Sequence, residues 1–575
     1  MKELLRYLKD YKKESVLGPL FKLLEASFEL FIPLVIANIV DIGIRDRDLP
    51  YVWHMGILLV ALAMIGLVCS ITAQYFAAKA AVGFATELRH DLFAHIQSLS
   101  YSELDTIGTS TLITRMTSDV NQVQSGINLV LRLFLRSPFI VFGAMVMAFT
   151  IDVKAALIFA VTIPLLSVVV FGVMLVSIPL YRRVQGCLDR VMGITRENLT
   201  GIRVIRAFNQ QEHEKQSFEE ANGQLVREQI FVGKISAMMN PVTYVIINGA
   251  IVVLIWTGAL QVEAGILTQG AVIALVNYMS QILVELIKLA NLIISITKSL
   301  ACARRIQAVF ETRPGMRETA EGPVTEQEDA GEVVFEHVSF TYKNAKEPSL
   351  TDIHFSVKRG QTIGIIGGTG SGKSSLVNLI PRFYDVTSGR LLIRGRDAKE
   401  YPFAQLRSKI GIVPQKAVLF KGTIADNLRW GKEDATEEEM RKALAAAQAL
   451  DFVEEKEEGL NTAVLQGGKN FSGGQKQRLT IARALVKDPE ILILDDSASA
   501  LDYATDASLR KAIRSLNPEM TVFIVSQRAA SVWNADQIVV LDDGEIAGLG
   551  THQELLETCQ VYQEIYYSQF QKEGA

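Results

Sequence analysis

Six long apolar runs in the first half of the chain restrict its fold more than any other feature. Each is about as long as the roughly 20 residues that cross a bilayer as a helix, and the run from Ala155 to Tyr181 has no charged residue. Buried helices of a large soluble core are the alternative, which six such runs disfavour. We expect membrane spans near residues 15–40, 55–80, 128–151, 155–180, 240–262 and 270–296, within an all-α membrane domain over residues 15–310.

Two long segments between the spans, residues 81–127 and 182–239, are charged and helix-patterned. They indicate that the flanking spans continue beyond the bilayer on one side, and the positive-inside bias puts that side in the cytoplasm. The arginines that carry this bias are Arg89, Arg115, Arg182, Arg183, Arg203 and Arg206. Residues 1–14 alternate leucine with lysine and lack the features of a signal peptide, so they predict an amphipathic helix on the membrane surface.

Several ionisable residues lie within or near these spans, where a charge is costly. They are Lys22, Glu25, Glu29, Arg132, Arg136, Glu285 and Lys288. One hypothesis places them along a substrate path. The other is structural: they reach the membrane interface or pair with one another, as Glu285 and Lys288 can from one helix face. The sequence leaves both hypotheses open.

The second half of the chain has a different composition. Residues 311–330 are polar, contain proline and glycine, and predict a linker, whereas residues 331–575 contain short β-rich runs. Overall, 49% hydrophobic with 21% charged residues fits a membrane part fused to a soluble part. The net charge of -4 gives no basic footprint for nucleic acid. Four widely separated cysteines indicate neither a disulfide framework nor a zinc site.

A phosphate-binding motif stands in this second half. The apolar strand QTIGIIG leads into G-x-x-x-x-G-K-S, from Gly367 to Ser374, and then into a helical pattern. The glycines let backbone N–H groups turn toward phosphates, Lys373 would reach the β- and γ-phosphates, and Ser374 would hold Mg²⁺. The motif predicts ATP and Mg²⁺ as ligands. Its binding residues are Gly367, Gly368, Thr369, Gly370, Ser371, Gly372, Lys373, Ser374 and Ser375.

A second motif, EILILDD, ends in two adjacent carboxylates. An unbroken apolar run is typical of a parallel strand buried on both faces, and ligands bind at the carboxyl ends of such strands. We therefore expect an α/β P-loop nucleotide-binding domain in which Asp495 holds Mg²⁺ through its water shell.

Between the two motifs, FSGGQ at Phe471–Gln475 resembles the LSGGQ signature of ATP-binding-cassette proteins. With six spans ahead of it, the whole chain resembles a half-transporter of the ABC exporter type. The resemblance implies that Tyr342 stacks on adenine and that Gln415 contacts Mg²⁺ and links the site to the membrane domain. It also implies that the opposite subunit's ATP is capped by Ser472, Gly473, Gly474 and Gln475 and flanked by the D-loop, Ser499–Asp502.

Two further stretches, residues 114–124 and 201–214, resemble the ends of the cytoplasmic loops that dock on nucleotide domains in this family. Solvated charged helices explain these stretches equally well on physical grounds.

The chain departs from the family pattern at three places. Asp496 stands where the family has its catalytic glutamate, and one methylene less misplaces the carboxylate by about an ångström, enough to cost about 10²-fold in rate. Gln527 stands where the family has a histidine, and an amide cannot carry a proton as an imidazole does. The segment Thr462–Gly468 lacks the family's acidic residue. The first two substitutions act on the same γ-phosphate, beside an intact phosphate loop, and predict a site that binds ATP and hydrolyses it slowly.

A homodimer would contain two weakened sites, so the sequence predicts a heterodimer. The partner is a half-transporter that carries the catalytic glutamate and the histidine, and the assembly resembles bacterial multidrug exporters that move amphipathic compounds outward by alternating access. The nucleotide domain is expected in the cytoplasm and the spans in the cell membrane. A lipid, peptide or siderophore transporter of the same fold is an alternative, as is an ATP-gated channel or regulatory subunit. The sequence does not identify the cargo.

Overall fold

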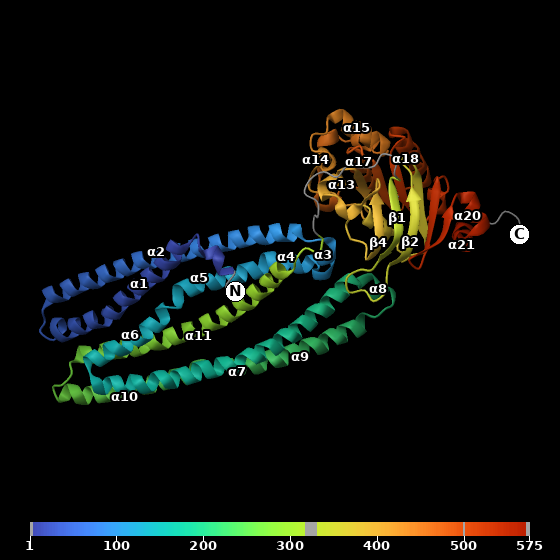
Figure 1. The fold of residues 1–575 in the computed structure, drawn as a ribbon. Coiled ribbons are helices and arrows are strands. Elements are labelled where there is room, and N and C mark those ends of the chain that lie inside the picture. Colours follow the sequence, from blue (N-terminus) through green and yellow to red (C-terminus); the bar gives the residue numbers. More distant parts are fainter. Residues whose placement is uncertain (1–3, 317–330, 498, 500, 571–575) are drawn as a thin grey trace. The chain divides into compact units, whose positions relative to one another are not determined.

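The computed structural model describes residues 4–316, 331–497, 499 and 501–570 (Figure 1). The chain divides into two compact units. The helical unit comprises Met1–Gln97 and Ser110–Thr312, and the α/β unit comprises Ser98–Thr109 and Arg313–Ala575. Most of the predicted linker, residues 317–330, lies outside the described residues, as do residues 1–3 of the predicted surface helix and Ala500 of the predicted D-loop.

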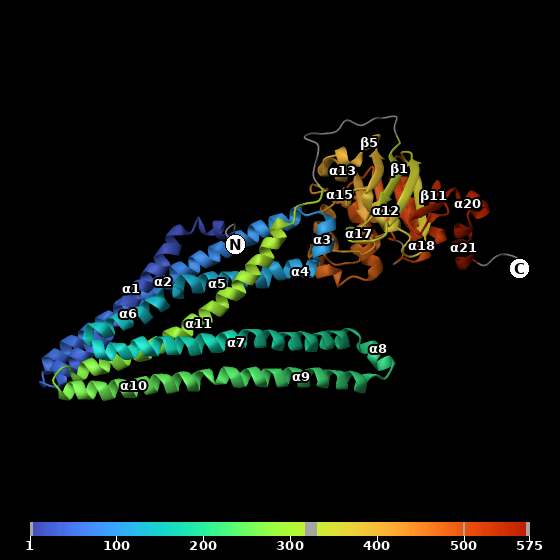
Figure 2. The same cartoon turned by 60° about the horizontal axis from the view of Figure 1, so that its bottom comes forward.

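The helical unit is built from long helices, with α7 and α9 side by side (Figures 1 and 2). Its helices are α1 (Lys12–Asn38), α2 (Leu49–Ser98), α4 (Thr109–Thr114), α5 (Val120–Leu133), α6 (Arg136–Ile151), α7 (Val153–Thr200), α8 (Ile202–Ala207), α9 (Gln211–Ala237), α10 (Met239–Glu263) and α11 (Gln269–Glu311). Among the described residues, six helical stretches are long and apolar enough to cross a membrane. They are Lys12–Ile44, Leu49–Ser98, Thr109–Ile151, Val153–Thr200, Gln211–Glu263 and Gln269–Glu311.

Each predicted span falls inside one of these six stretches, so the all-α membrane domain is confirmed. Helices α2 and α7 contain 50 and 48 residues. At a rise of 1.5 Å per residue they are about 70–75 Å long, more than twice the thickness of a hydrocarbon core of about 30 Å. The predicted extension of these helices beyond the bilayer is therefore also confirmed.

Helix α11 lies at the centre of the helical unit, where it packs against α1, α5, α6, α7 and α10. Its N-terminus is fixed by two hydrogen bonds: the Thr268 hydroxyl accepts the Ala271 N–H at 3.3 Å, and the distant Asp41 accepts the Gly270 N–H through Oδ1 at 2.7 Å. A Cβ at Gly270 would lie 2.2 Å from the Ala37 carbonyl oxygen. Only glycine permits this close approach of α11 to α1.

Of the seven charged residues named for the spans, all but Arg132 form ion pairs with one another in the described structure. Lys22 Nζ lies 2.5 Å from Glu25 Oε2 on α1. The predicted pair of Glu285 and Lys288 is confirmed, with a distance of 2.8 Å between Oε1 and Nζ. Arg136 joins this pair from α6, donating to Glu285 Oε1 at 2.7 Å. These contacts support the structural hypothesis for the residues involved, because a buried charge is stable when it is paired.

The α/β unit contains a six-stranded sheet in the order β12-β11-β3-β10-β9-β6 and a four-stranded sheet in the order β2-β1-β4-β5. The first is parallel apart from the edge strand β12, and the second is antiparallel. The strands are β1 (Val333–Phe340), β2 (Leu350–Val357), β3 (Thr362–Gly367), β4 (Ser388–Ile393), β5 (Arg396–Asp397), β6 (Ile410–Val413), β7 (Gly422–Thr423), β8 (Ala463–Val464), β9 (Ile491–Asp495), β10 (Thr521–Val525), β11 (Gln537–Asp542) and β12 (Glu545–Gly550).

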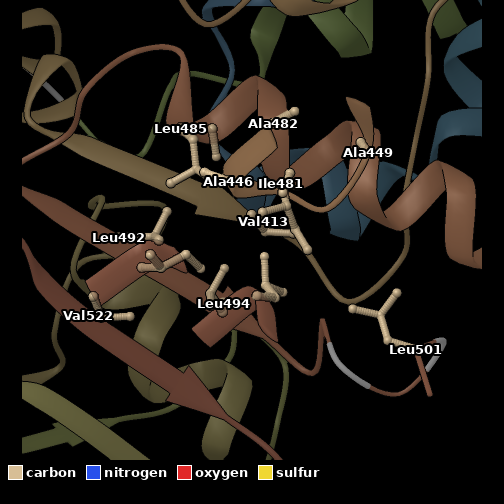
Figure 3. Packing of buried hydrophobic residues seen from close by; sticks show 14 of the residues in the cluster. Val413, Ala446, Ala449, Ile481, Ala482, Leu485, Leu492, Leu494, Leu501 and Val522 are labelled. Atoms are coloured by element: carbon tan, nitrogen blue, oxygen red, sulfur yellow. The ribbon is translucent and has the colours of Figure 1, made fainter. Parts of the chain in front are cut away.

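Helices cover the six-stranded sheet and close its core. They are α12 (Lys373–Leu379), α13 (Phe403–Ser408), α14 (Ile424–Arg429), α15 (Glu437–Ala446), α16 (Leu450–Glu454), α17 (Gly473–Leu485), α18 (Tyr503–Leu516), α19 (Ala529–Val532), α20 (His552–Thr558) and α21 (Gln560–Gln569), with α3 (Tyr101–Ile107) joining the unit from the first half of the chain. Figure 3 shows Ile481 and Leu485 of α17 beside Leu492 and Leu494 of β9. The predicted fold class is confirmed, and the parallel order brings the carboxyl ends of β3, β9 and β10 together.

Candidate nucleotide-binding site

The phosphate-binding motif forms the predicted loop between β3 and α12. Gly370 and Gly372 have φ angles of +87° and +91°, which L side chains rarely adopt. A Cβ at Gly372 would also lie 2.6 Å from the Ser349 carbonyl oxygen. Lys373 donates to the carbonyl oxygens of Gly367 at 3.0 Å and Gly368 at 2.5 Å. These glycines therefore set a tight loop whose lysine folds back over it.

Two side-chain oxygen atoms that can bind a metal ion meet where strand β9 and the phosphate loop end. The Ser374 hydroxyl donates to Asp495 Oδ1 at 3.0 Å, from the start of α12 to the last residue of the buried strand β9. Hydroxyl and carboxylate oxygens are ligands that Mg²⁺ prefers, and Mg²⁺ commonly takes only one or two of them from a protein. Ser374 and Asp495 therefore fit the predicted metal.

Burial also shifts two pKa values at this point. Burial raises the pKa of Asp495, and the charge of Asp496 adds to that effect against the opposing Ser374 hydrogen bond. Burial lowers the pKa of the Lys373 ammonium, opposed by the charges of Asp496 and Asp495. Each charged form is disfavoured in the folded protein until a ligand of opposite charge arrives, which is typical of a functional site.

Asp496 has a fixed backbone. Its φ angle is +46°, its N–H donates to the Val525 carbonyl at 3.0 Å, and its own carbonyl accepts from the Ser499 hydroxyl at 2.8 Å. The side-chain amide of Gln415 lies 3.5 Å from Asp496 Oδ2. One bond to the neighbouring strand β10 and one to Ser499, three residues further on, therefore hold the main chain at Asp496.

A cavity of about 800 Å³ collects these groups. Its lining includes the predicted residues Tyr342, Thr369, Gly370, Gly372, Lys373, Ser374, Ser375, Gln415, Asp495, Asp496 and Gln527. Gly367, Gly368 and Ser371 belong to the same loop but do not line the cavity: Gly367 and Ser371 are buried, and Gly368 is exposed. The lining has the donors and carboxylates that a nucleoside triphosphate with Mg²⁺ requires.

The FSGGQ segment does not line this cavity. Ser472 is the N-cap of α17, with a capping box in which its hydroxyl accepts the Gln475 N–H at 3.3 Å and Gln475 Oε1 accepts the Ser472 N–H at 3.0 Å. Ser472 and Gly473 are exposed, and Gly474 and Gln475 are half-buried. The segment is thus rigid and accessible at a helix N-terminus, away from the chain's own phosphate loop.

Tyr342 lies at one side of the cavity, where its hydroxyl is 2.9 Å from the Ser375 hydroxyl. Sequence reasoning missed its neighbour Tyr384, whose ring meets Tyr342 edge-on at 5.2 Å between centroids. The Tyr384 hydroxyl donates to Asp105 Oδ2 at 2.6 Å, so α3 is connected to the aromatic side of the cavity. Burial and the Asp105 carboxylate both raise the pKa of Tyr384.

Docking of the first predicted stretch remains a prediction, and the structure adds a short helix before it, α3, to the α/β unit. Residues 114–124 lie in the helical unit, whereas α3 belongs to the α/β unit. Helix α3 begins at a capping box between Ser100 and Glu103 and ends before Gly108, whose φ angle is +81°. Glu103 Oε2 also accepts the Gly315 N–H at 3.2 Å. The Ser-x-x-Glu pattern followed by glycine was the sequence signal for this short helix.

The second stretch, residues 201–214, includes α8 at the turn between α7 and α9 (Figure 2). Its apolar side chains are exposed: Val204 is 60% and Phe208 is 72% accessible. Docking of this turn remains a prediction.

Comparisons with known proteins agree with this architecture. Residues 15–286 match the family described as ABC transporter transmembrane region, and residues 350–499 match the family described as ABC transporter. The uncharacterized ABC transporter ATP-binding protein YfiB of Bacillus subtilis is 38% identical over 100% of both chains. The putative multidrug export ATP-binding/permease protein YgaD of the same organism is 34% identical over 98% of both.

The ATP-dependent lipid A-core flippase of Hahella chejuensis is 31% identical over 99% of both chains. Among solved structures, a bacterial Atm1-family ABC exporter with ATP bound superposes with a TM-score of 0.79 at 22% identity, covering 98% of this chain and 99% of that one. At this identity, the similarity to the solved structure shows that the two chains share a fold.

Proposed function

The chain belongs to the ABC transporter family, and we propose that it is the slowly hydrolysing half of a heterodimeric exporter. Its family and fold make it an ATP-hydrolysing exporter and a multi-pass protein of the plasma membrane. The proposal goes further in three respects: the weakness of the chain's own site, the need for a different partner chain, and the class of cargo.

The fixed backbone of Asp496 carries the proposal. Catalysis at this position needs a carboxylate that orients the attacking water in line with the γ-phosphate. Since the Asp496 peptide is bonded to Val525 and Ser499, its carboxylate stays about one methylene short of a glutamate's reach. A misplacement of that order costs about 10²-fold in rate.

The other groups of the cavity are proposed to bind ATP. Lys373 and the loop glycines hold the phosphates, Tyr342 stacks on adenine, and Gln527 donates its amide to the γ-phosphate without being able to move a proton. Ser374 and Asp495 hold Mg²⁺, with Gln415 beside them. The metal would neutralise charge on the β- and γ-phosphates.

The accessible FSGGQ segment supports the need for a partner. Ser472 to Gln475 lie away from the cavity and are free to cap a nucleotide held by another chain. We propose that they complete a competent site on a second half-transporter that carries the catalytic glutamate and the histidine. Closure of the two nucleotide domains on ATP would then open the membrane cavity outward, and hydrolysis on the partner would reset it.

The proposed cargo is an amphipathic or drug-like compound, as the name of the YgaD relative suggests for that protein. A lipid is the second candidate, favoured by the relative named as a lipid A-core flippase. Transport of fluorescent dyes and of labelled lipids by the reconstituted pair distinguishes the two.

The decisive measurement is the ATPase rate of the chain purified alone and then with the half-transporter encoded beside it. We expect little activity alone and brisk activity from the pair. Asp496→Glu should raise the rate of the chain alone and change that of the pair only modestly, while Lys373→Ala serves as the background control. Brisk hydrolysis by the unaltered chain alone would show that Asp496 is a sufficient base, and the heterodimer proposal would fail. Steady substrate-stimulated ATP consumption by the pair would exclude the alternative of a gated channel or regulatory subunit.

A further inference from the structure

The loop that carries Gln527 joins β10 to α19, and its main chain is bonded on several sides. The Ser526 N–H donates to the Ile365 carbonyl at 3.0 Å, and the Arg528 N–H donates to the Ser526 hydroxyl at 3.0 Å. The Arg528 guanidinium reaches the Leu501 carbonyl at 3.3 Å. These bonds fix the residues on both sides of Gln527, but none of them involves the Gln527 carbonyl.

One side chain from the far end of the chain supplies that contact. Gln569, the last residue of α21, donates from Nε2 to the Gln527 carbonyl at 2.7 Å. Its Oε1 accepts the N–H of Ala529, the first residue of α19, at 2.9 Å. The two partners fix the orientation of this amide, since a carbonyl needs the NH₂ group and an N–H needs the oxygen.

Helix α21 is a firm support for this amide. The ring of Phe570, directly after Gln569, stacks on Trp533 just beyond α19, with 5.6 Å between centroids. On the same helix Tyr562 is fully buried, and its hydroxyl lies 2.8 Å from His552 Nδ1. A polar group mounted on packed aromatic residues loses little freedom when it forms its bonds, so it can hold a loop in one geometry.

We propose that Gln569 is a positioning residue for the γ-phosphate contact: it clamps the Gln527 loop to α21 and so sets the preference of the site for ATP over ADP. This inference rests on the proposed contact between Gln527 and the γ-phosphate. ADP lacks that phosphate, so loosening the loop weakens triphosphate binding and leaves diphosphate binding unchanged. Lys373 and the loop glycines act on both nucleotides.

The test measures the dissociation constants of Mg²⁺-ATPγS and Mg²⁺-ADP for the full-length chain in lipid nanodiscs. Gln569→Ala removes both hydrogen bonds. Gln569→Glu keeps an oxygen that accepts the Ala529 N–H but places a second carboxylate oxygen against the Gln527 carbonyl, which it repels. The matched control is Gln563→Ala on the same helix, whose Nε2 donates to the Leu556 carbonyl at 2.7 Å, remote from the cavity. Thermal unfolding of every variant is recorded alongside.

Both Gln569 variants should lower the preference for ATPγS over ADP by about three- to tenfold, the range expected for one or two hydrogen bonds. Gln563→Ala should leave the preference unchanged at a similar melting temperature. An unchanged preference in the Gln569 variants, or an equal loss in Gln563→Ala, would overturn the clamp. The ratio does not depend on hydrolysis, so a brisk ATPase of the chain alone would refute the degenerate-site proposal without touching this one. If the unaltered chain bound ATPγS no more tightly than ADP, both the proposed γ-phosphate contact of Gln527 and the clamp by Gln569 would be refuted.

Discussion

Replacing Glu285 by methionine should destabilise the helical unit by about 3 kcal/mol. The Glu285 carboxylate is 4% exposed and accepts from Arg136 at 2.7 Å, Lys288 at 2.8 Å and the Ser137 hydroxyl at 2.7 Å. Breaking a buried ion pair from one side costs about 3–5 kcal/mol because a charge remains unpaired. The lower end applies here, since Arg136 keeps the carboxylate of Glu29 at 2.7 Å.

The double variant Arg136→Met with Glu285→Met should be far milder than the sum of the two single variants. It removes both charges together, and the remaining Glu29 and Lys288 side chains, 37% and 41% exposed, are not enclosed by the helical unit. Replacing a buried pair by apolar residues of similar size is often close to neutral. We expect a coupling energy of at least about 2 kcal/mol between the two positions. Glu212→Met is the control, because Glu212 is 90% exposed and its ion pair with Lys215 contributes about 0–1 kcal/mol.

Thermal unfolding followed with a thiol-reactive dye measures this cycle, since Cys69 and Cys302 are free and buried in the helical unit. Additive losses in the double variant would refute the claim that the pair acts as a unit. A double variant that keeps its stability but loses transport would show that these charges serve the substrate path and not the stability of the helical unit.

Two further predictions concern the α/β unit. Asp495→Asn should raise the melting temperature without nucleotide and abolish the stabilisation by Mg²⁺-ATP. Burial raises the pKa of Asp495, so ionisation of this carboxyl destabilises the folded protein as pH rises through the raised pKa. A lower melting temperature of the variant without nucleotide would contradict this reasoning. Burial opposes ionisation of Glu103, but the Ser100 hydroxyl and the Gly315 N–H prevail and hold its pKa below the usual value. The stability that ionised Glu103 contributes is present above about pH 4.3 and is lost as pH falls through the lowered pKa. Glu103→Gln should therefore reduce the fall in melting temperature at acidic pH. The same fall in the variant as in the unaltered chain would contradict this.

Features that depend on neighbours in the sequence were predictable. The spans follow from the length and charge of contiguous apolar runs, because a bilayer sets the number of residues that a helix needs. The phosphate loop follows from eight consecutive residues, Gly367 to Ser374, whose glycines permit positive φ angles and whose lysine and serine supply the donors. Asp495 follows because it ends a run of apolar residues that forms the buried strand β9.

Features that depend on distant residues were not predictable. Helix α3 was missed because its position in the α/β unit rests on contacts such as that of Asp105 with Tyr384, 279 residues away. Arg136 meets Glu285 across 149 residues, although the Glu285–Lys288 pair was visible from its helical spacing. Nothing in the spacing of Gln569 connects it to Gln527, 42 positions earlier.

The sequence by itself therefore determined the membrane spans, the P-loop domain and the residue types of the cavity, including the aspartate at 496 and the glutamine at 527. Each of these is a property of local backbone periodicity or of residue type. Only the tertiary structure decided that the main chain of Asp496 is held in place, that Arg136 meets Glu29 and Glu285, and that Gln569 of α21 bonds to the Gln527 loop. Those outcomes depend on which surfaces pack together, and packing brings groups together irrespective of their separation along the chain.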